Sequence, residues 1–268
     1  MPVYRIFSHR FGRLSVVAAA WLALLAFQPM AHADGLDTVM KAGILRVAVV
    51  LDYPPFGTIG KDMKPEGYDV EVAGLLAQAI GVKLQLVPVS SANKIPYLQA
   101  RKADVLLNIG SNPERTKVVD FSAPYAPYYI GVFGPADIKV ASLADLQGKT
   151  VGATRGSFEE LIVSKTAPGG TDVRRFEDNA TTIAAFMAGQ TQLIAMGNIV
   201  AANLLTQKTA RRPEQKLLLL NSPVRAAVLK GETRLLDKTN AAIAELKKNG
   251  TLPKMAEHWL KQPLPKDF

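Results

Sequence analysis

Apolar positions in this chain alternate between two spacings from residue 45 onward. Short apolar runs typical of buried strands lie at residues 45–50 and 105–107, and the alternating residues 82–89 also predict a strand. Between the first run and this alternating stretch, residues 68–80 carry apolar side chains at helical spacing, and Gly81 ends the predicted helix. Shorter helices are expected at 35–42 and 95–101. Strands that alternate with helices predict an α/β fold in which helices cover both faces of a parallel sheet.

The same alternation begins again after Gly134 and Pro135, which break a long strand predicted at 128–133. The strands expected in this second unit lie at 150–153, 173–176, 193–196 and 217–220. The helices expected between and beside them lie at 142–146, 158–165, 180–188 and 199–205. A returning strand at 226–229 then precedes helices at 235–247 and 252–260.

This order predicts two α/β lobes. The first lobe combines residues 34–133 with 222–268, and the second spans 134–221. Because the chain crosses between the lobes twice, the two crossing strands, at 129–133 and about 224–229, can act as a hinge around a cleft.

The first 33 residues have the pattern of a signal peptide. Arg5, Arg10 and Arg13 give a basic start, residues 14–27 are apolar, and the small-x-small residues 31–33 form a cleavage site before Asp34. A retained N-terminal anchor is the alternative. The chain contains no Cys, so neither a disulfide nor a lipid-attachment cysteine is expected. We therefore expect a cleaved, exported protein that is free in the periplasm.

The chain is basic, with a formal net charge of +9. Its cationic residues are scattered, and an exported protein does not meet nucleic acid, so we expect no nucleic-acid partner. A mild positive field favours an anionic ligand or an acidic docking partner. His258 is the only histidine outside the predicted signal peptide, so no metal or cofactor is expected.

The stretch 103–125 carries the first candidate chemistry. A buried strand ends at Asn108 in a polar loop, and Asn112 followed by Pro113 predicts a helix start. Arg115 would then lie in the first turn, beside free backbone N–H groups, where its guanidinium could bind a small carboxylate in bidentate fashion. The alternative is a solvated Arg115 that pairs with Glu114 or Asp120.

Two further predicted strands end in residues that could belong to the same binding site. Residues 52–56 read Asp-Tyr-Pro-Pro-Phe, and the two prolines would present Tyr53 and Phe56 as an aromatic wall. Both rings could instead belong to the core. Ser91 lies in the polar loop after the next strand, and in a parallel sheet the carboxyl ends of the strands share one crevice.

With these segments assembled, residues 34–268 resemble a known family. The resemblance rests on ordered matches that include DYPPF at 52–56, EGYDVE at 66–71, KADV at 102–105, NPERTKVVDFSAPY at 112–125 and LQGKTVG at 146–152. The chain is similar to the periplasmic binding proteins of amino-acid ABC importers, the family-3 solute-binding proteins. The resemblance implies a monomeric, two-lobed, non-enzymatic protein that captures a small carboxylate-bearing solute, an amino acid or a derivative, for an inner-membrane ABC permease.

The resemblance also implies roles for individual residues. Tyr53 would stack on the ligand, Ser91 would face its side chain, Asn108 and Gly110 would contact its α-amino group, and Arg115 would hold its carboxylate together with backbone N–H groups near Ser157 and Phe158.

The chain departs from the family pattern at several positions. The family usually has a hydroxyl residue where Gly110 stands and often one where Phe158 stands. The aspartate that binds the α-amino group falls on Gly197 here, and only the neutral Asn198 lies beside it. Recognition of the ligand's carboxylate is therefore expected. Recognition of its α-ammonium group is left open, with Asp52 as a possible substitute for the aspartate.

Two other function classes remain. An enzyme like the cyclohexadienyl dehydratases of the same family would need a cleft acid, for which Asp52 is the candidate, since His258 is expected far from the crevice. A periplasmic sensor protein is the third class.

Overall fold

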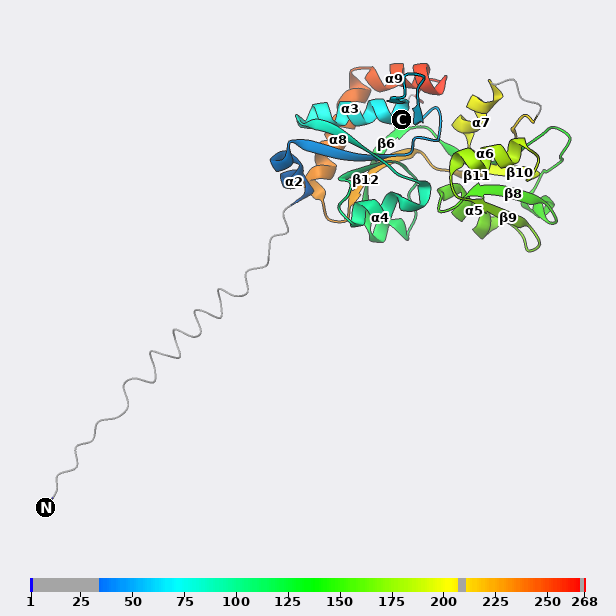
Figure 1. Ribbon diagram of the computed structural model, residues 1–268, viewed down its shortest axis with the longest axis horizontal. Helices are drawn as coiled ribbons and strands as arrows, with labels where there is room; N and C mark the ends of the chain where they lie inside the picture. Colours follow the sequence, from blue (N-terminus) through cyan, green and yellow to red (C-terminus); the bar gives the residue numbers. More distant parts are fainter. Residues whose placement is uncertain (2–33, 207–210, 266–267) are drawn as a thin grey trace. The chain divides into compact units, whose positions relative to one another are not determined.

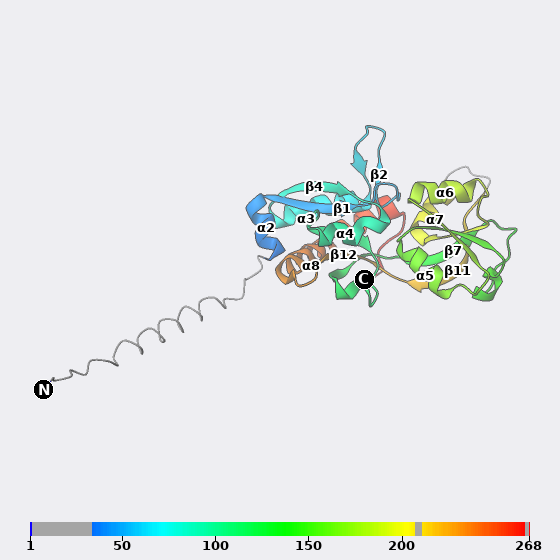
Figure 2. The same ribbon diagram turned by 60° about the horizontal axis from the view of Figure 1, so that its bottom comes forward.

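The computed structural model describes residues 34–206 and 211–265 together with Met1 and Phe268. Apart from Met1, the predicted signal peptide lies outside the described residues. The residues from Asp34 to Phe268 form one unit, which Figures 1 and 2 show from two directions. Among the described helices, none is both long enough and apolar enough to cross a membrane.

The first sheet carries helices on both faces. Its strands lie in the order β4 (Lys83–Pro88), β1 (Ile44–Val49), β5 (Val105–Ile109), β12 (Val224–Leu229) and β6 (Val119–Ala126). β1 runs parallel to β4 and β5, whereas β12 is antiparallel to β5 and β6. The prediction of an α/β fold is confirmed.

Alternate side chains of each strand enter different cores, as the two-residue repeat of a strand requires. Val47, Val105 and Leu107 pack on the face covered by α3 (Tyr68–Ile80) and α8 (Thr233–Lys248). Ala48 and Leu106 pack on the opposite face, below α4 (Lys94–Gln99). Both faces of the strands are therefore buried, which explains why residues 105–107 are apolar without alternation.

The remaining elements of this lobe are short. They are α2 (Gly35–Ala42), α9 (Thr251–Met255), the hairpin β2 (Thr58–Ile59) and β3 (Pro65–Glu66), the turns η1 (Ser91–Asn93) and η2 (Arg115–Lys117), and the π-helical turn η4 (Ala256–Leu260). Figure 2 shows the β2–β3 hairpin extending away from the sheet.

The second sheet has the order β11 (Glu214–Asn221), β7 (Tyr129–Gly134), β10 (Leu193–Gly197), β8 (Thr150–Thr154) and β9 (Asp172–Phe176). One face packs on α5 (Phe158–Thr166) and the turn η3 (Leu143–Leu146), through Val151, Ala153 and Val163. The other face packs on α6 (Asn179–Met187) and α7 (Asn198–Leu205). The second α/β lobe is thus built in the same way as the first (Figure 1).

The chain passes between the sheets twice, from β6 to β7 and from β11 to β12. β7 pairs with β10 and β11 throughout, so it belongs to the second sheet. Sheet membership therefore favours placing residues 129–134 in the second lobe, and the lobe boundaries predicted from the sequence stay predictions.

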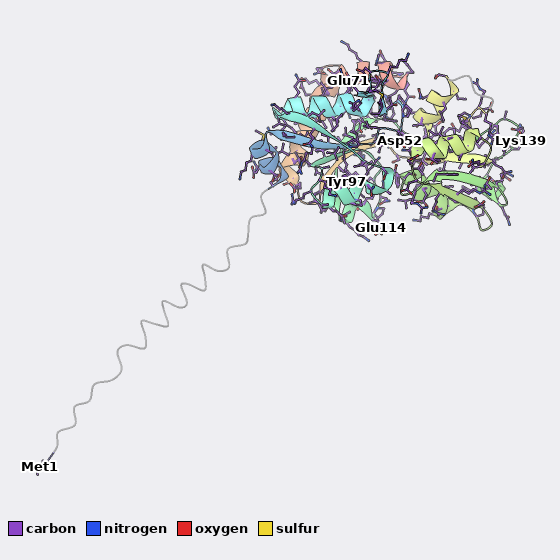
Figure 3. All side chains as sticks on the ribbon, in the orientation of Figure 1. Met1, Asp52, Glu71, Tyr97, Glu114 and Lys139 are labelled. Atoms are coloured by element: carbon purple, nitrogen blue, oxygen red, sulfur yellow. The ribbon has the colours of Figure 1, made fainter. Side chains whose placement is uncertain are left out.

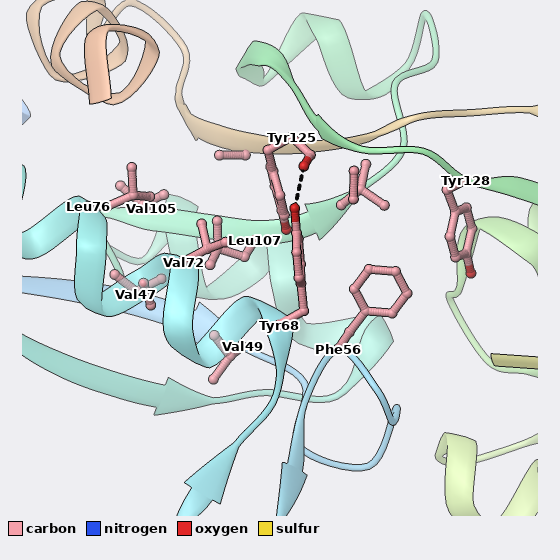
Figure 4. Packing of buried hydrophobic residues seen from close by; sticks show 14 of the residues in the cluster. Val47, Val49, Phe56, Tyr68, Val72, Leu76, Val105, Leu107, Tyr125 and Tyr128 are labelled. Carbon is pink, nitrogen blue, oxygen red and sulfur yellow. Dashed lines mark hydrogen bonds between the residues drawn. The ribbon is translucent and has the colours of Figure 1, made fainter. Parts of the chain in front are cut away.

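Aromatic side chains next to the cleft pack against one another in the core of the first lobe. Tyr68 of α3 donates a hydrogen bond to the carbonyl oxygen of Tyr125 at 2.6 Å and stacks on its ring at 5.9 Å (Figure 4). Phe56 is fully buried. Its ring makes an edge-on contact with the ring of Tyr68 and another with the ring of Tyr128. The reading of Phe56 as a core residue is therefore confirmed.

The structure corrects one predicted element. Residues 115–117 form a single 3₁₀ turn, η2, in place of the predicted helix, because the chain enters the strand β6 at Val119. The side chain of Asn112 still caps this turn by accepting a hydrogen bond from the backbone N–H of Arg115 at 2.7 Å. The strand 119–126, which pairs with the distant β12, was not predicted.

Candidate ligand-binding site

A cavity of about 40 Å³ lies where the strand ends of the two lobes meet. Seven of the residues predicted for the site line it: Tyr53, Ser91, Asn108, Gly110, Arg115, Ser157 and Phe158. The other lining residues are Val50, Lys94, Ile109, Tyr128, Gly156, Glu159, Asn179, Ser222 and Val224. A cavity of this size holds only a few water molecules, so these walls are close together.

Arg115 enters the cavity from η2. Its Nη1 donates to the carbonyl oxygen of Gly110 at 3.0 Å, and its guanidinium lies 4.8 Å from the centre of the Phe158 ring. Neither carboxylate proposed as its partner reaches it, because Glu114 pairs with Lys117 and Asp120 pairs with Lys230. Within the described residues Arg115 has no ion pair. Burial lowers its pKa, while the charge of Glu159 opposes that effect.

Lys94, the first residue of α4, adds a second cation. Its Nζ donates to the carbonyl oxygen of Asn108 at 2.5 Å, and no carboxylate in the described part of the chain pairs with it. Burial, followed by repulsion from Arg115, lowers the pKa of Lys94 to about 8. The first lobe thus presents two cations whose hydrogen bonds go to backbone carbonyls.

Asn108 is held by the core behind it. It adopts a left-handed backbone conformation, with φ of 54°, and its Nδ2 donates to Asp69 at 3.0 Å. Tyr125 accepts from the backbone N–H of Asn108 and donates to Asp69. Burial raises the pKa of Asp69 to about 6, although these hydrogen bonds oppose the rise. The side chain of Asn108 therefore fixes the end of β5.

The second lobe contributes the start of α5. Ser157 caps this helix, and its Oγ accepts from the backbone N–H of Glu160 at 3.0 Å. The ring of Phe158 lies against Gly110, where a Cβ would come within 2.0 Å of the ring. A hydroxyl residue at position 110 would therefore have no room.

Glu159 is the acid of the cavity. It is 8% exposed, and its Oε1 accepts from the hydroxyl of Tyr128 at 2.5 Å and from that of Tyr53 at 3.2 Å. The two tyrosyl oxygens are 2.6 Å apart. Burial, followed by the charge of Glu159, raises the pKa of both tyrosines well above the usual range, so both hydroxyls stay protonated and can donate.

Comparison with known proteins agrees with this geometry. Residues 45–262 match the family model described as bacterial extracellular solute-binding proteins, family 3. The chain belongs to this family. It is 32% identical over 258 residues to the L-cystine-binding protein TcyJ of Escherichia coli, covering 93% of this chain and 95% of that protein.

Two further similarities bear on function. The crystal structure of a cysteine-binding protein from Campylobacter jejuni matches with a TM-score of 0.80 and 26% identity, covering 88% of this chain and 96% of that one. Cyclohexadienyl dehydratase of Pseudomonas aeruginosa is 38% identical over 112 residues, which are 41% of this chain and 42% of the enzyme.

This solute-binding protein differs from the pattern expected of its family at position 197. The ring of Tyr128 fills the space beside Gly197, where a Cβ would lie 1.9 Å from the tyrosyl oxygen. Asn198, predicted as a site residue, is not among the residues that line the cavity. Its Oδ1 accepts from the backbone N–H of Tyr129 at 2.9 Å, so it fastens α7 to β7.

Asp52, the substitute acid considered from the sequence, lies near the boundary of the two lobes (Figure 3), and it contacts Asn179 of the second lobe. Its carboxylate accepts from the backbone N–H groups of Asn179 at 2.8 Å and Ala180 at 3.2 Å, and from the Asn179 Nδ2 at 3.0 Å. Asp52 therefore caps α6 across the cleft, and it does not line the cavity.

Sequence reasoning missed Lys94, Tyr128 and Glu159. Each follows or precedes a predicted site segment closely, but a glutamate in the first turn of a helix is ordinary for dipole reasons, and a tyrosine between two strands resembles core. The signal that could have found them is their position in the segments that follow strands, where the predicted site residues also lie. Within the described residues no cluster of His, Cys, Asp or Glu could hold a metal ion.

Proposed function

We propose that this protein captures a small carboxylate-bearing solute, an amino acid or a derivative, in the cleft between its lobes and delivers it to an inner-membrane ABC permease. The observation that carries the proposal is Arg115, a half-buried guanidinium that lines the cavity and has no ion pair among the described residues. A desolvated guanidinium binds a carboxylate more strongly than any neutral group. The names of the relatives, which bind cystine and cysteine, support an amino acid.

The predicted site residues have these roles in the proposal. Arg115 holds the carboxylate, helped by backbone N–H groups at the start of α5 near Ser157 and Phe158. Tyr53 and Ser91 bound the side of the ligand.

The setting is the periplasm of the cell, which the protein reaches with a cleaved signal peptide at 1–33. It acts there as a monomer and without a cofactor or a catalytic step. The family description, extracellular solute-binding proteins, supports an exported binding protein.

A thermal-shift screen tests the proposal. The purified protein is heated with each standard amino acid, with L-cystine and with simple carboxylic acids. A ligand at a hundred times its dissociation constant adds about 2.7 kcal/mol, which raises the melting temperature of a chain of this size by about 5–10 °C. Absence of any shift across the panel contradicts the proposal.

The variant Arg115→Met identifies the anchor. This substitution should weaken binding of the tightest-binding ligand by about 2–4 kcal/mol, since the ligand's carboxylate then has no charged partner. Arg234→Met is the matched control, because Arg234 is exposed on α8 and pairs with Asp37. Binding by Arg115→Met that equals binding by the control would remove Arg115 from the site.

An enzymatic function has one observation in its favour, the buried acid Glu159 in the cavity. A dehydratase needs such an acid to protonate its leaving group. The Oε1 of Glu159 already accepts hydrogen bonds from the hydroxyls of Tyr128 and Tyr53, however, which is the geometry of an acceptor and not of a proton donor. We therefore expect no loss of water when the protein is incubated with a cyclohexadienyl acid and the product is followed by absorbance.

A further inference from the structure

Glu159 is a buried carboxylate that lacks a cation of its own. Its Oε1 accepts from two tyrosyl hydroxyls, while Oε2 accepts no hydrogen bond from any described residue. No lysine or arginine of the described chain lies within ion-pair distance of it. The neighbouring Glu160 is equally buried, at 8% exposed, yet it pairs with Arg175 at 2.8 Å.

A buried charge without a charged partner is costly, so proteins keep one mainly where a ligand or a reaction uses it. Here the tyrosines lower that cost without neutralising the charge. Because Tyr53 belongs to the first lobe and Tyr128 to the connection between the lobes, the carboxylate is fixed at the point where the lobes meet. Its second oxygen is left for a donor that the protein does not supply.

The other wall of the same cavity has the opposite charge. Arg115 and Lys94 line it from the first lobe, and their hydrogen bonds go to the carbonyl oxygens of Gly110 and Asn108. Those carbonyls are therefore occupied by cations and are poor acceptors for a further ammonium group. A cavity with cations on one wall and a carboxylate on the other is complementary to a small zwitterion.

Position 197 cannot supply this acid. The ring of Tyr128 stands where a side chain at Gly197 would begin, and the same Tyr128 holds Glu159. The tyrosine therefore both closes the space of the expected aspartate and positions another carboxylate nearby.

We infer that Glu159 binds the ammonium group of an amino acid whose carboxylate lies against Arg115. The inference rests on the proposed function and narrows its ligand class to solutes with a free α-ammonium group. Deaminated acids of the same shape then bind weakly, because they leave the Glu159 charge without a partner.

The test compares amino acids with their deaminated partners by calorimetry. The probe pairs are L-alanine with propionate, L-phenylalanine with 3-phenylpropionate, L-aspartate with succinate and L-glutamate with glutarate. Wild type should prefer the amino acid of every pair that binds. Glu159→Gln keeps the shape of the side chain and an acceptor for the tyrosines, but removes the charge.

We expect Glu159→Gln to lose about tenfold or more in affinity for the amino acid and to change affinity for the deaminated partner by less than about threefold. Glu160→Gln should leave both affinities unchanged. The melting temperature of unliganded Glu159→Gln should equal or exceed that of wild type, because an unpaired buried charge has been removed. A lower melting temperature together with an equal loss for both partners would indicate a merely structural role and overturn the inference.

The failures of the two proposals differ. If wild type binds no member of any pair and nothing in the thermal-shift panel, the proposed function fails and this inference fails with it. If wild type binds carboxylates but shows no preference for the amino acid, or if Glu159→Gln keeps the preference of wild type, only the role of Glu159 is overturned.

Discussion

Removal of the Asp52 carboxylate should weaken ligand binding although Asp52 does not line the cavity. Asp52 follows β1 of the first lobe and accepts three hydrogen bonds from the start of α6 in the second lobe. Because these bonds join the two lobes, we propose that they exist only when the lobes are closed. The variant Asp52→Ala therefore destabilises the closed form relative to the open form.

The size of the effect follows from the geometry. A half-exposed carboxylate that caps a helix and interacts with its dipole contributes about 1–2 kcal/mol. Because we propose that the ligand binds the closed form, we expect the loss to appear as a decrease in affinity of about 5- to 30-fold. Asp52→Asn keeps an acceptor oxygen and loses the charge, so its ligand affinity should lie between those of wild type and Asp52→Ala.

The assay combines calorimetry and small-angle scattering. The probe is the amino acid that raises the melting temperature most in the screen. Wild type should show a smaller radius of gyration at saturation than without ligand, and Asp52→Ala should need a higher concentration to reach the same radius.

Asp178→Ala is the matched control. Asp178 caps the same helix from within the second lobe, by accepting from the backbone N–H of Thr181 at 2.7 Å. Its loss should lower the stability of α6 without changing lobe closure. Equal affinities of Asp52→Ala and Asp178→Ala, or a scattering profile that ligand does not change, would refute the reasoning.

Three further predictions concern single side chains. Gly197→Ala should destabilise the protein by about 1–3 kcal/mol in urea unfolding, because its Cβ displaces the Tyr128 ring; Gly74→Ala, whose Cβ meets no atom within 4 Å, should be neutral or stabilising, and equal effects would contradict this. Asn198→Asp should leave the preference for amino acids over deaminated acids within about twofold of wild type, since position 198 does not line the cavity; a gained preference would contradict this. Unliganded wild type should gain about 1 kcal/mol of stability between pH 7 and 9, because folded Lys94 releases its proton near pH 8 while the unfolded chain keeps it to about 10.5; Lys94→Met should lack that part of the gain, and an equal gain in both proteins would contradict it.

Local periodicity predicted most of the fold. The strands β1, β4 and β5 and the helix α3 could be predicted from the sequence alone. Burial of one or both faces of each element dictates which of its positions are apolar. The helix expected after Asn112 did not form. Residues 119–126 instead pair with β12, about a hundred positions further along the chain, and such a pairing leaves no local signal.

The candidate site was predictable where it depends on strand ends. Tyr53, Ser91, Asn108 and Arg115 line one cavity because parallel strands of one sheet end at the same edge. The contacts of Glu159 could not be predicted, since they come from two tyrosines that reach it from other parts of the chain.

Two glycines show why single positions of a family pattern are poor guides to a ligand. At Gly110 and at Gly197 the chain lacks a polar side chain, and each gap is filled by an aromatic ring from a facing segment, Phe158 and Tyr128. Each ring also makes a polar contact: Phe158 lies under the guanidinium of Arg115, and Tyr128 donates to Glu159. Where the family pattern predicts two polar groups, the cleft therefore has two rings that contact an arginine and a glutamate. Because a glycine and its ring must change together, restoring Asp at position 197 alone would displace Tyr128 and release Glu159, and so would add one acid only by disturbing the other.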